Sequence, residues 1–278
     1  MTERTGPGRL VLVATPIGNL GDLPPRAVEA LSAATLVCCE DTRRTGRLLQ
    51  HAGVRAQRLA VANDHTELAR ITDVLDVLGA GGDVAVVTDA GTPGVSDPGE
   101  RLVRAALDAG FEVTAVPGPA AAVMAITISG LPTSRFVFEG FLPRSGRERA
   151  ERLAEIAAEP RTSVIYEAPH RIQRTLADLR DACGEERSVA VCRELTKLYE
   201  EVVRGALGEI SIDQPRGEYV VVLGGRPMET MTIDDDTIRA ALRSEITAGS
   251  SKKDAVAAVT KRFGAPRKTV YALAVTLD

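Results

Sequence analysis

The chain has 278 residues, of which 44% are hydrophobic and 3% aromatic, and its formal net charge is −4 at pH 7. This length accommodates one large or two ordinary domains, each with its own core. No apolar run approaches the roughly 18 residues of a membrane span, and the first residues lack the apolar region of a signal peptide. We therefore expect a cytoplasmic protein without a membrane segment. The four cysteines and three histidines show no ligand spacing, which argues against a metal site.

Charge is distributed unevenly along the chain. From Ile238 to the last residue there are eight Lys or Arg against three Asp or Glu, so this tail has a net charge of +5. Because the whole chain has a net charge of −4, the preceding 237 residues have a net charge of −9. Such an asymmetry favours a tail that contacts a polyanion, although solvated helix faces would give the same count.

Short apolar runs alternate with helical patterns through the first 117 residues. The runs that predict strands are 10–14, 36–39, 84–88 and 113–116. The segments that predict helices are 25–34, 66–78 and 98–109. This alternation predicts an α/β domain with a parallel sheet, and strands that are apolar throughout indicate that both faces of the sheet are covered.

A second α/β domain is expected over 118–227 and a helical unit over 228–278, after a first domain of 1–117. The strand-like runs of the second domain are 136–141, 162–168, 188–195, 201–207 and 218–225, with helices near 147–158 and 170–183. Because its later strands are close together in sequence, we expect antiparallel pairs beside parallel ones. A helix of small residues within 117–132 connects the two domains.

The end of the chain shows the capping residues of short helices. The acidic run 234–236 can begin a helix that Gly249 ends. Ser251 and Asp254 are spaced as a capping box for the next helix, which Gly264 ends. A helix-turn-helix bundle and a plain helical cap are both compatible with this pattern.

Several unusual loops are expected at the carboxyl edge of the first sheet, where ligands of parallel sheets bind. Their sequences are TPIGNLGDL, EDTRRT, DAGTPGVSDPG and PGPAAA. None contains a Walker or a GxGxxG motif. Gly and Pro allow close approach of the backbone to a ligand, Asp89 and Asp97 can accept hydrogen bonds, and the alanines 120–122 leave room for a flat ring. These features favour an adenosine-like ligand without a polyphosphate, which would require more cations.

The motifs ATPIGNLGDL, CEDTRRTGRLL, DAGTPGVSDPG, PGPAAA with SGLP, EGFLPR, YEAPHR, RELTK and GEYVVVLGG occur in that order. Together they resemble the ribosomal RNA small-subunit methyltransferase I family, a branch of the tetrapyrrole methylase superfamily. The resemblance implies two α/β domains with S-adenosylmethionine in the cleft between them, usually in a homodimer. It also implies 2′-O-methylation of a cytidine ribose in the decoding centre of 16S ribosomal RNA. The basic tail is similar to an extra C-terminal domain of some members.

The resemblance further implies which residues line the cofactor cleft. They are Pro16, Asp89, Gly91, Thr92, Ala120, Ala121, Phe141, Tyr166 and Glu218. We interpret the stiff DAGTPGVSDPG turn as a wall of this cleft that holds its shape before the cofactor binds.

Methyl transfer to a ribose hydroxyl also requires a base or a nearby cation, because that hydroxyl is a poor nucleophile at neutral pH. The candidates are Lys197 and Asp41, followed by Glu40 and Glu194. For Glu194 and Lys197, an ion pair between strand ends is the alternative. His170 in YEAPHR starts a predicted helix, which favours a structural role.

Basic residues near the cleft and in the tail are candidates for contacts to RNA phosphates. They are Arg43, Arg44, Arg47, Arg144, Arg147, Lys252 and Lys253. For the first three, a solvated helix face is the alternative. Because aromatic residues are few and Trp is absent, we expect salt-sensitive contact with the assembled small subunit through phosphates and shape rather than base stacking.

Three other functions are compatible with parts of the sequence. A sister methylase acting on a tetrapyrrole or a protein side chain would share the fold and cofactor, but would not require EDTRRT or the basic tail. A non-catalytic ribosome-binding factor would bind no cofactor. A Rossmann-type dehydrogenase is disfavoured because its glycine fingerprint is missing.

Overall fold

The computed structural model describes residues 6–227 and 234–277. The chain divides into two compact units, Met1–Pro227 and Met228–Asp278, and each is described by itself. The first unit contains two five-stranded sheets, one formed by strands before residue 117 and the other by strands after residue 135. The observed α/β architecture confirms the expected fold class.

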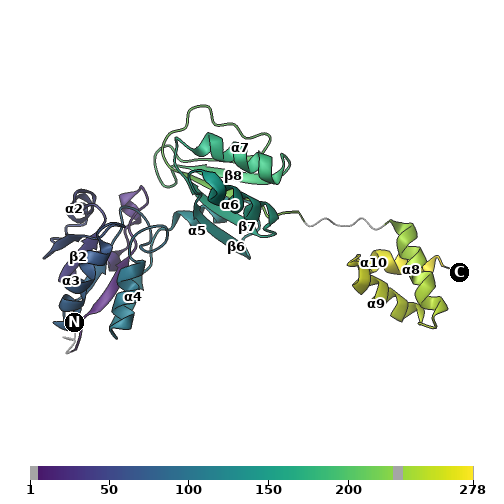
Figure 1. The fold of residues 1–278 in the computed structure, drawn as a ribbon, viewed down its shortest axis with the longest axis horizontal. Helices are drawn as coiled ribbons and strands as arrows, with labels where there is room; N and C mark the ends of the chain where they lie inside the picture. The colour runs from purple at the N-terminus through teal and green to yellow at the C-terminus, as the bar shows by residue number, and fades with distance from the viewer. Residues whose placement is uncertain (1–5, 228–233, 278) are drawn as a thin grey trace. The chain divides into compact units, whose positions relative to one another are not determined.

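The first sheet is parallel throughout (Figure 1). Its strands are β1 (Arg9–Val13), β2 (Leu36–Cys39), β3 (Leu59–Val61), β4 (Val84–Val86) and β5 (Glu112–Val116). Their order across the sheet is β3-β2-β4-β1-β5, and Leu10 of β1 lies opposite Val84 on one side and Val113 on the other. All five strands therefore end at the same edge, where the unusual loops follow.

Helices cover both faces of this sheet, as the apolar strands predicted. They are α1 (Pro25–Ala33), α2 (Thr42–His51), α3 (Glu67–Gly79) and α4 (Glu100–Asp108). Cys39 packs in the core on the α1 and α2 side, and Cys38 in the core on the α3 and α4 side. Both are free, buried thiols, and burial raises the pKa of Cys38 to about 12. These cysteines are therefore inert core residues.

The second sheet mixes parallel and antiparallel pairs, which confirms the sequence prediction. Its strands are β6 (Phe136–Phe141), β7 (Thr162–Glu167), β8 (Ser188–Arg193), β9 (Glu201–Ala206) and β10 (Tyr219–Leu223). In the order β6-β7-β10-β8-β9 only the β6–β7 pair is parallel. The helices α6 (Gly146–Ala158) and α7 (Ile172–Cys183) pack on one face and α5 (Ala121–Ser129) on the other.

The second unit is a bundle of three helices with its own core. They are α8 (Asp235–Thr247), α9 (Lys252–Phe263) and α10 (Arg267–Val275). The capping residues act as predicted: the Ser251 hydroxyl accepts from the Asp254 N–H at 3.2 Å and donates to its carboxylate at 2.6 Å. Gly264 ends α9 in the left-handed conformation, at φ 64°. Leu242, Val256 and Val270 are buried where the helices meet.

Two elements differ from the sequence prediction. The EDTRRT segment was expected to be a loop, but Asp41 begins helix α2, which continues to His51. Strand β3 was not predicted, because it has only three residues and Leu59 is exposed at the sheet edge. In the described ranges no helix combines the length and apolar character that crossing a membrane requires.

Candidate active site

The loops that follow β1, β4 and β5 are joined by hydrogen bonds. Thr15 and Gly91 exchange two backbone bonds, of 2.8 and 3.1 Å, and the Thr15 hydroxyl donates to the Thr88 carbonyl at 3.2 Å. The Thr92 hydroxyl donates to the Pro119 carbonyl at 3.2 Å. We call the assembly of segments 15–23, 40–45, 88–99 and 117–122 the loop junction. It contains six of the nine expected cofactor residues, Pro16, Asp89, Gly91, Thr92, Ala120 and Ala121. A seventh, Tyr166, accepts a hydrogen bond from Ala122 of the loop junction.

The DAGTPGVSDPG turn is stiff for reasons that the structure makes explicit. Gly91 and Gly94 have φ of 86° and 81°, and Ser96, which is not a glycine, has φ 59°. Left-handed backbone at a non-glycine residue is found mainly where surrounding structure holds it in place. A side chain at Gly91 would also meet the Ile17 side chain at 3.4 Å. The turn therefore depends on glycine for its shape.

The far end of this turn is anchored by a buried carboxylate. Glu67 is 3% exposed, and one of its oxygens accepts from the backbone N–H groups of Gly99, Arg101 and Leu102 at 3.0, 3.0 and 3.1 Å. These are otherwise unpaired donors at the start of α4. The sequence analysis did not identify Glu67, and its position at the start of α3 carries no distinctive signal.

A cluster of carboxylates lies at the loop junction. The Asp89 N–H donates to Glu40 at 3.2 Å, and Arg44 forms an ion pair with Asp89 at 3.2 Å. The other Asp89 carboxylate oxygen is buried and accepts no hydrogen bond from the described residues. Burial raises the pKa of Glu40 and, despite Arg44, that of Asp89. Burial, together with the charges of Glu40 and Asp89, raises the pKa of Asp97 to about 7. The cluster holds more negative charge than its protein neighbours neutralise.

Residues of the second sheet complete this side of the site. The Ala122 N–H, at the start of α5, donates to the Tyr166 hydroxyl at 3.1 Å. The Tyr166 ring packs edge-on against Phe138 and Phe141, with centroid distances of 4.9 and 5.6 Å. Phe141 is 53% exposed. Tyr166, Phe141 and the small residues that open α5 are therefore neighbours, as expected for one wall of a site.

A bulge in β6 brings the second sheet against the DAGTPGVSDPG turn. Pairing with β7 shifts register between Phe138 and Gly140, and Gly140 has φ 62°. A Cβ at Gly140 would lie 2.9 Å from the Ser96 hydroxyl. The positive φ favours glycine, and a Cβ there would require the Ser96 hydroxyl to move. The sequence analysis did not anticipate this approach.

The RELTK segment forms a strained turn around Lys197. Glu194 and Thr196 have φ of 51° and 67°. The Lys197 ammonium lies 2.7 Å from carboxylate oxygens of both Glu194 and Glu218, so the ion pair considered from sequence is present. Burial alone would lower the pKa of Lys197, but hydrogen bonds to the two carboxylates outweigh it and raise that pKa. Lys197 is held as a cation.

This turn is also attached to the loop after β1. The Asn19 N–H donates to the Thr196 hydroxyl at 3.1 Å, and the aliphatic stem of Lys197 lies against Gly18, where a Cβ would collide with it. Beyond Lys197 the side chains of Leu198 and Tyr199 are 89% and 70% exposed. Lys197 therefore lies where loops from both sheets meet.

The structure gives Asp41 a different environment from the other candidate bases. It caps α2 by accepting from the Arg43 N–H at 2.8 Å and forms an ion pair with the Arg43 guanidinium at 2.9 Å. The Arg43 hydrogen bonds lower the pKa of Asp41 to about 2. A carboxylate of such low basicity is a poor proton acceptor.

The predicted RNA-binding residues are exposed, but some of them form ion pairs or hydrogen bonds with other residues of the protein. Arg44 pairs with Asp89, and Arg147 pairs with Glu151 at 2.6 Å on the surface of α6. Arg47 and Arg144 are exposed. In the second unit, the Lys252 ammonium donates to the Leu277 carbonyl at 2.8 Å, whereas Lys253 is exposed.

A buried network explains the EGFLPR and YEAPHR motifs. Arg149 is 3% exposed and donates to Asp178, to the Thr175 hydroxyl and to the Pro143 carbonyl at 2.8 to 2.9 Å. Glu167 accepts from Thr175 at 2.6 Å. The network fixes the segment before Arg144, a role that sequence reasoning missed because Arg149 resembles the surface arginines around it. Among the described residues no cluster has the make-up of a metal site.

Comparisons with known proteins agree with this architecture. A family model described as Tetrapyrrole (Corrin/Porphyrin) Methylases matches residues 9–211. The crystal structure of the methyltransferase CobJ superposes with a TM-score of 0.61 at 23% identity, covering 80% of this chain and 95% of that one. Uroporphyrin-III C-methyl transferase from Thermus thermophilus, complexed with S-adenyl homocysteine, gives a TM-score of 0.53 at 20% identity, with 78% and 97% covered.

These matches define the class: the protein is a methyltransferase with the tetrapyrrole methylase fold. The Ribosomal RNA small subunit methyltransferase I of Synechocystis sp. is 43% identical over 276 residues, covering 98% of this chain and 99% of that protein. The chain belongs to the ribosomal RNA small subunit methyltransferase I family, as its motifs predicted. Membership also confirms S-adenosylmethionine as the expected cofactor.

Proposed function

We propose that this protein transfers a methyl group from S-adenosylmethionine to the ribose 2′-hydroxyl of a cytidine in the decoding centre of 16S ribosomal RNA. Its relative from Synechocystis sp. is named for the small-subunit ribosomal RNA. The observation that carries the chemical proposal is the Lys197 cation, held between Glu194 and Glu218 where loops of both sheets meet. We further propose that it acts in the cytoplasm as a homodimer on the assembled small subunit.

The loop junction suits the cofactor in shape and charge. Gly91 adds no side chain beside its backbone bonds to Thr15, and Ala120 and Ala121 offer little steric bulk. The unsatisfied Asp89 oxygen and the raised pKa of Asp97 indicate unbalanced negative charge. When bound, S-adenosylmethionine supplies a methyl group on a positively charged sulfonium. The carboxylates of the loop junction would stabilise that charge and would accept hydrogen bonds from the ligand.

The acceptor ribose would lie beside Lys197. Because its pKa is raised, Lys197 serves as a cation that stabilises negative charge developing on the 2′-oxygen, rather than as the proton acceptor. Of the two candidate bases Glu40 and Asp41, Glu40 is the more basic, because its pKa is raised while the pKa of Asp41 is about 2. Leu198 and Tyr199 are exposed next to this position and would face the acceptor nucleotide.

Phosphates flanking the acceptor would contact arginines around the loop junction. Arg43, Arg47 and Arg144 are exposed, and the network around Arg149 fixes the segment that carries Arg144. In the second unit Lys253 is exposed, and Lys252 keeps its ammonium on the Leu277 carbonyl. Lys253 is therefore the better phosphate ligand of the two.

Methyl transfer from tritiated S-adenosylmethionine tests the proposal directly. Small ribosomal subunits from cells lacking this gene are offered in parallel with naked ribosomal RNA, and cofactor binding is measured on the same protein. We expect label in the RNA of the intact subunit. Cofactor binding without label in either substrate would favour a sister methylase, and the absence of cofactor binding would favour a non-catalytic ribosome-binding factor.

A further inference from the structure

A second site is suggested by a pocket of about 380 Å³ at the end of the second sheet. Its lining includes Thr162 and Ser188, the first residues of β7 and β8, and Gly224, which follows β10. The candidate active site lies at the other end of these strands, near Tyr166 and Glu194. Because a six-residue strand spans about 20 Å, the pocket is separate from the active site.

The walls of the pocket are held by backbone contacts. The Gly224 N–H donates to the Ser188 carbonyl at 2.8 Å. At Gly225 a Cβ would collide with the Pro160 carbonyl, so only glycine permits this approach of the two segments. The final glycines of GEYVVVLGG, which the active site does not use, therefore shape this pocket.

A buried arginine lies in the wall. Arg187 is 5% exposed and donates to the Gly224 and Ala157 carbonyls at 3.0 and 2.8 Å. Its Nε is buried and has no acceptor among the described residues. Burial lowers the pKa of Arg187, and the nearby charge of Arg226 lowers it further. Because its hydrogen-bond partners are neutral carbonyls, an anion in the pocket would relieve an uncompensated positive charge.

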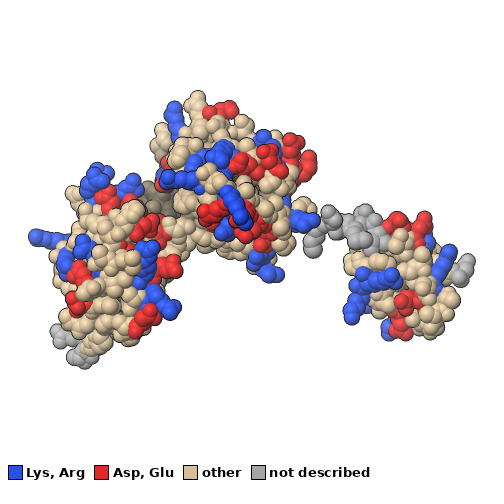
Figure 2. Space-filling model, viewed as in Figure 1, with Lys and Arg blue, Asp and Glu red and all other residues tan. Residues whose placement is uncertain are grey.

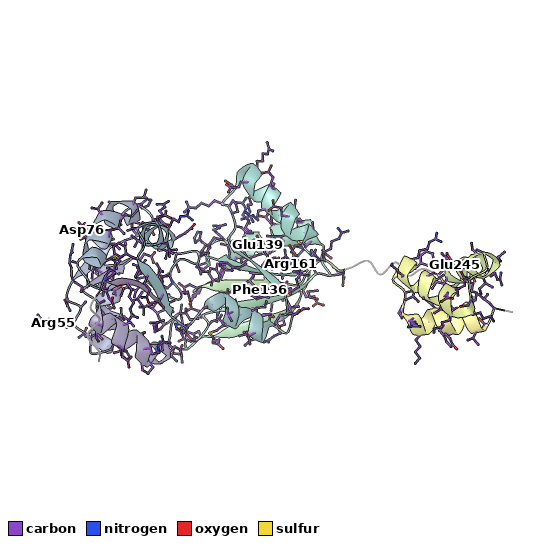
Figure 3. All side chains as sticks on the ribbon, turned by 90° about the horizontal axis from the view of Figure 1, so that it is seen from below. Arg55, Asp76, Phe136, Glu139, Arg161 and Glu245 are labelled. Atoms are coloured by element: carbon purple, nitrogen blue, oxygen red, sulfur yellow. The ribbon has the colours of Figure 1, made fainter. Side chains whose placement is uncertain are left out.

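Two further arginines line the opening. Arg161, labelled in Figure 3, forms an ion pair with Glu159, with contacts of 2.6 and 2.8 Å. Arg135 is exposed and forms no hydrogen bond or ion pair within residues 6–227 and 234–277, although its charge contributes to the lowered pKa of Glu159. Glu186 also lines the pocket, but it is exposed and pairs with none of these arginines in the described chain. The guanidinium of Arg135 is thus available to a ligand.

We propose that this arginine pocket, formed by Arg135, Arg161 and Arg187, binds a phosphate group of the RNA backbone. The inference rests on the proposed function for the identity of the RNA. Guanidinium groups match phosphate oxygens in geometry, and the volume lies within the range of small-ligand sites. Lys and Arg are interspersed with Asp and Glu on the visible face of residues 6–227 (Figure 2), so phosphate contacts there depend on discrete sites.

The separation of the two sites sets the length of RNA that can reach both. At about 3.4 Å of rise per nucleotide, a stacked strand that covers roughly 20 Å spans about six nucleotides. An oligonucleotide shorter than this would occupy one site only. The pocket would therefore strengthen binding of the long substrate without touching the reacting atoms.

The test compares Arg135→Glu with Arg55→Glu, a matched reversal at an exposed arginine outside the pocket. Methylation of small subunits gives KM and kcat, and calorimetry gives the affinity for S-adenosylmethionine. Fluorescence anisotropy of a labelled 16S fragment at several salt concentrations gives the salt slope, and inorganic phosphate serves as a competitor. We expect Arg135→Glu to raise KM for subunits about tenfold and to reduce the salt slope by about one. Its kcat and cofactor affinity, and every property of Arg55→Glu, should match the wild type.

Each result bears on the proposal. The proposal is supported if inorganic phosphate competes with the labelled fragment for the wild type but not for Arg135→Glu, and if KM is raised in that variant. Unchanged KM and salt slope in Arg135→Glu would overturn it, and phosphate binding by the wild type in that case would indicate a free-phosphate site. If the wild type binds RNA but transfers no methyl group, the proposed function fails while the anisotropy comparison still decides the pocket.

Discussion

The Lys197 ammonium lies 2.7 Å from a carboxylate oxygen of Glu218, although 21 residues separate them in the chain. Lys197 belongs to the turn after β8, and Glu218 directly precedes β10. Because β8 and β10 are antiparallel neighbours, the end of one strand meets the start of the other. This pairing fixes a cation at the place where we expect the acceptor ribose.

Removal of that cation should slow methyl transfer without loss of the fold. Lys197→Met keeps the stem that lies against Gly18 but removes the charge, so we expect kcat to fall about 100-fold or more. Lys197→Arg keeps a charge and should retain a larger share of the activity. Single-turnover transfer to small subunits measures both. Equal rates for Lys197→Met and the wild type would exclude the proposed role.

Gly91→Val should abolish cofactor binding while the protein stays folded. At φ 86° a β-branched side chain is strained and would also press on Ile17, which deforms the cofactor wall at a cost of about 1–3 kcal/mol. Gly53→Val is the matched control, because Gly53 has φ 67° and no atoms within 4 Å of a Cβ. Calorimetry and thermal unfolding separate the two effects. Normal cofactor affinity in Gly91→Val would show that this turn is not a cofactor wall.

Loss of the Glu67 carboxylate should destabilise the first unit. Glu67→Ala leaves three backbone donors, two of them buried, without their acceptor, and we expect the free energy of unfolding to fall by about 3 kcal/mol. Glu67→Gln retains one carbonyl oxygen and should lose less. Urea denaturation of the two variants provides the comparison. A change below about 0.5 kcal/mol in Glu67→Ala would mean that the anchor is not needed.

Asp97 should make stability depend on pH. Its pKa is about 7 in the folded protein, against about 3.9 in an unfolded chain. Between these values the folded state binds more protons, so the free energy of unfolding falls as pH rises from about 4 to 7. The full shift corresponds to about 4 kcal/mol, which partial solvent exposure reduces to on the order of 1–2 kcal/mol.

The variant Asp97→Asn isolates this effect. It should be more stable than the wild type at pH 8 and nearly equal to it at pH 4, because at the lower pH the wild-type carboxyl is protonated in the folded state and about half protonated in the unfolded chain, so its ionisation hardly affects stability. Urea denaturation at the two pH values measures the difference. If the stabilisation were the same at both pH values, titration of Asp97 would not be its cause.

Much of the fold could be predicted from the sequence because its signals are local. Apolar runs such as 36–39 indicate a sheet covered on both faces, and Ser251 with Asp254 marks the start of α9. Strand β3 gave no such signal, since three residues with Leu59 exposed do not form a pattern. Helix α2 was not among the predicted helices, because EDTRRT was considered mainly for chemistry and a helix face entered only as the alternative for its arginines.

The candidate site was predictable in part for a different reason. Loops after parallel strands meet at one edge, so Gly91 and Thr92 were expected near Ala120. Contacts between segments far apart in sequence have no local pattern. The approach of Gly140 to Ser96, the three donors on Glu67 and the burial of Arg187 required the folded structure.

The most direct measurement identifies the modified nucleoside. Small ribosomal subunits from cells lacking this gene are treated with the protein and S-adenosylmethionine, and their RNA is digested to nucleosides and analysed by mass spectrometry beside a Lys197→Met reaction. Our account predicts 2′-O-methylcytidine, formed by the wild type and strongly reduced in the variant. A methyl group on a base or on a ribosomal protein, or equal yields from the two proteins, would contradict it.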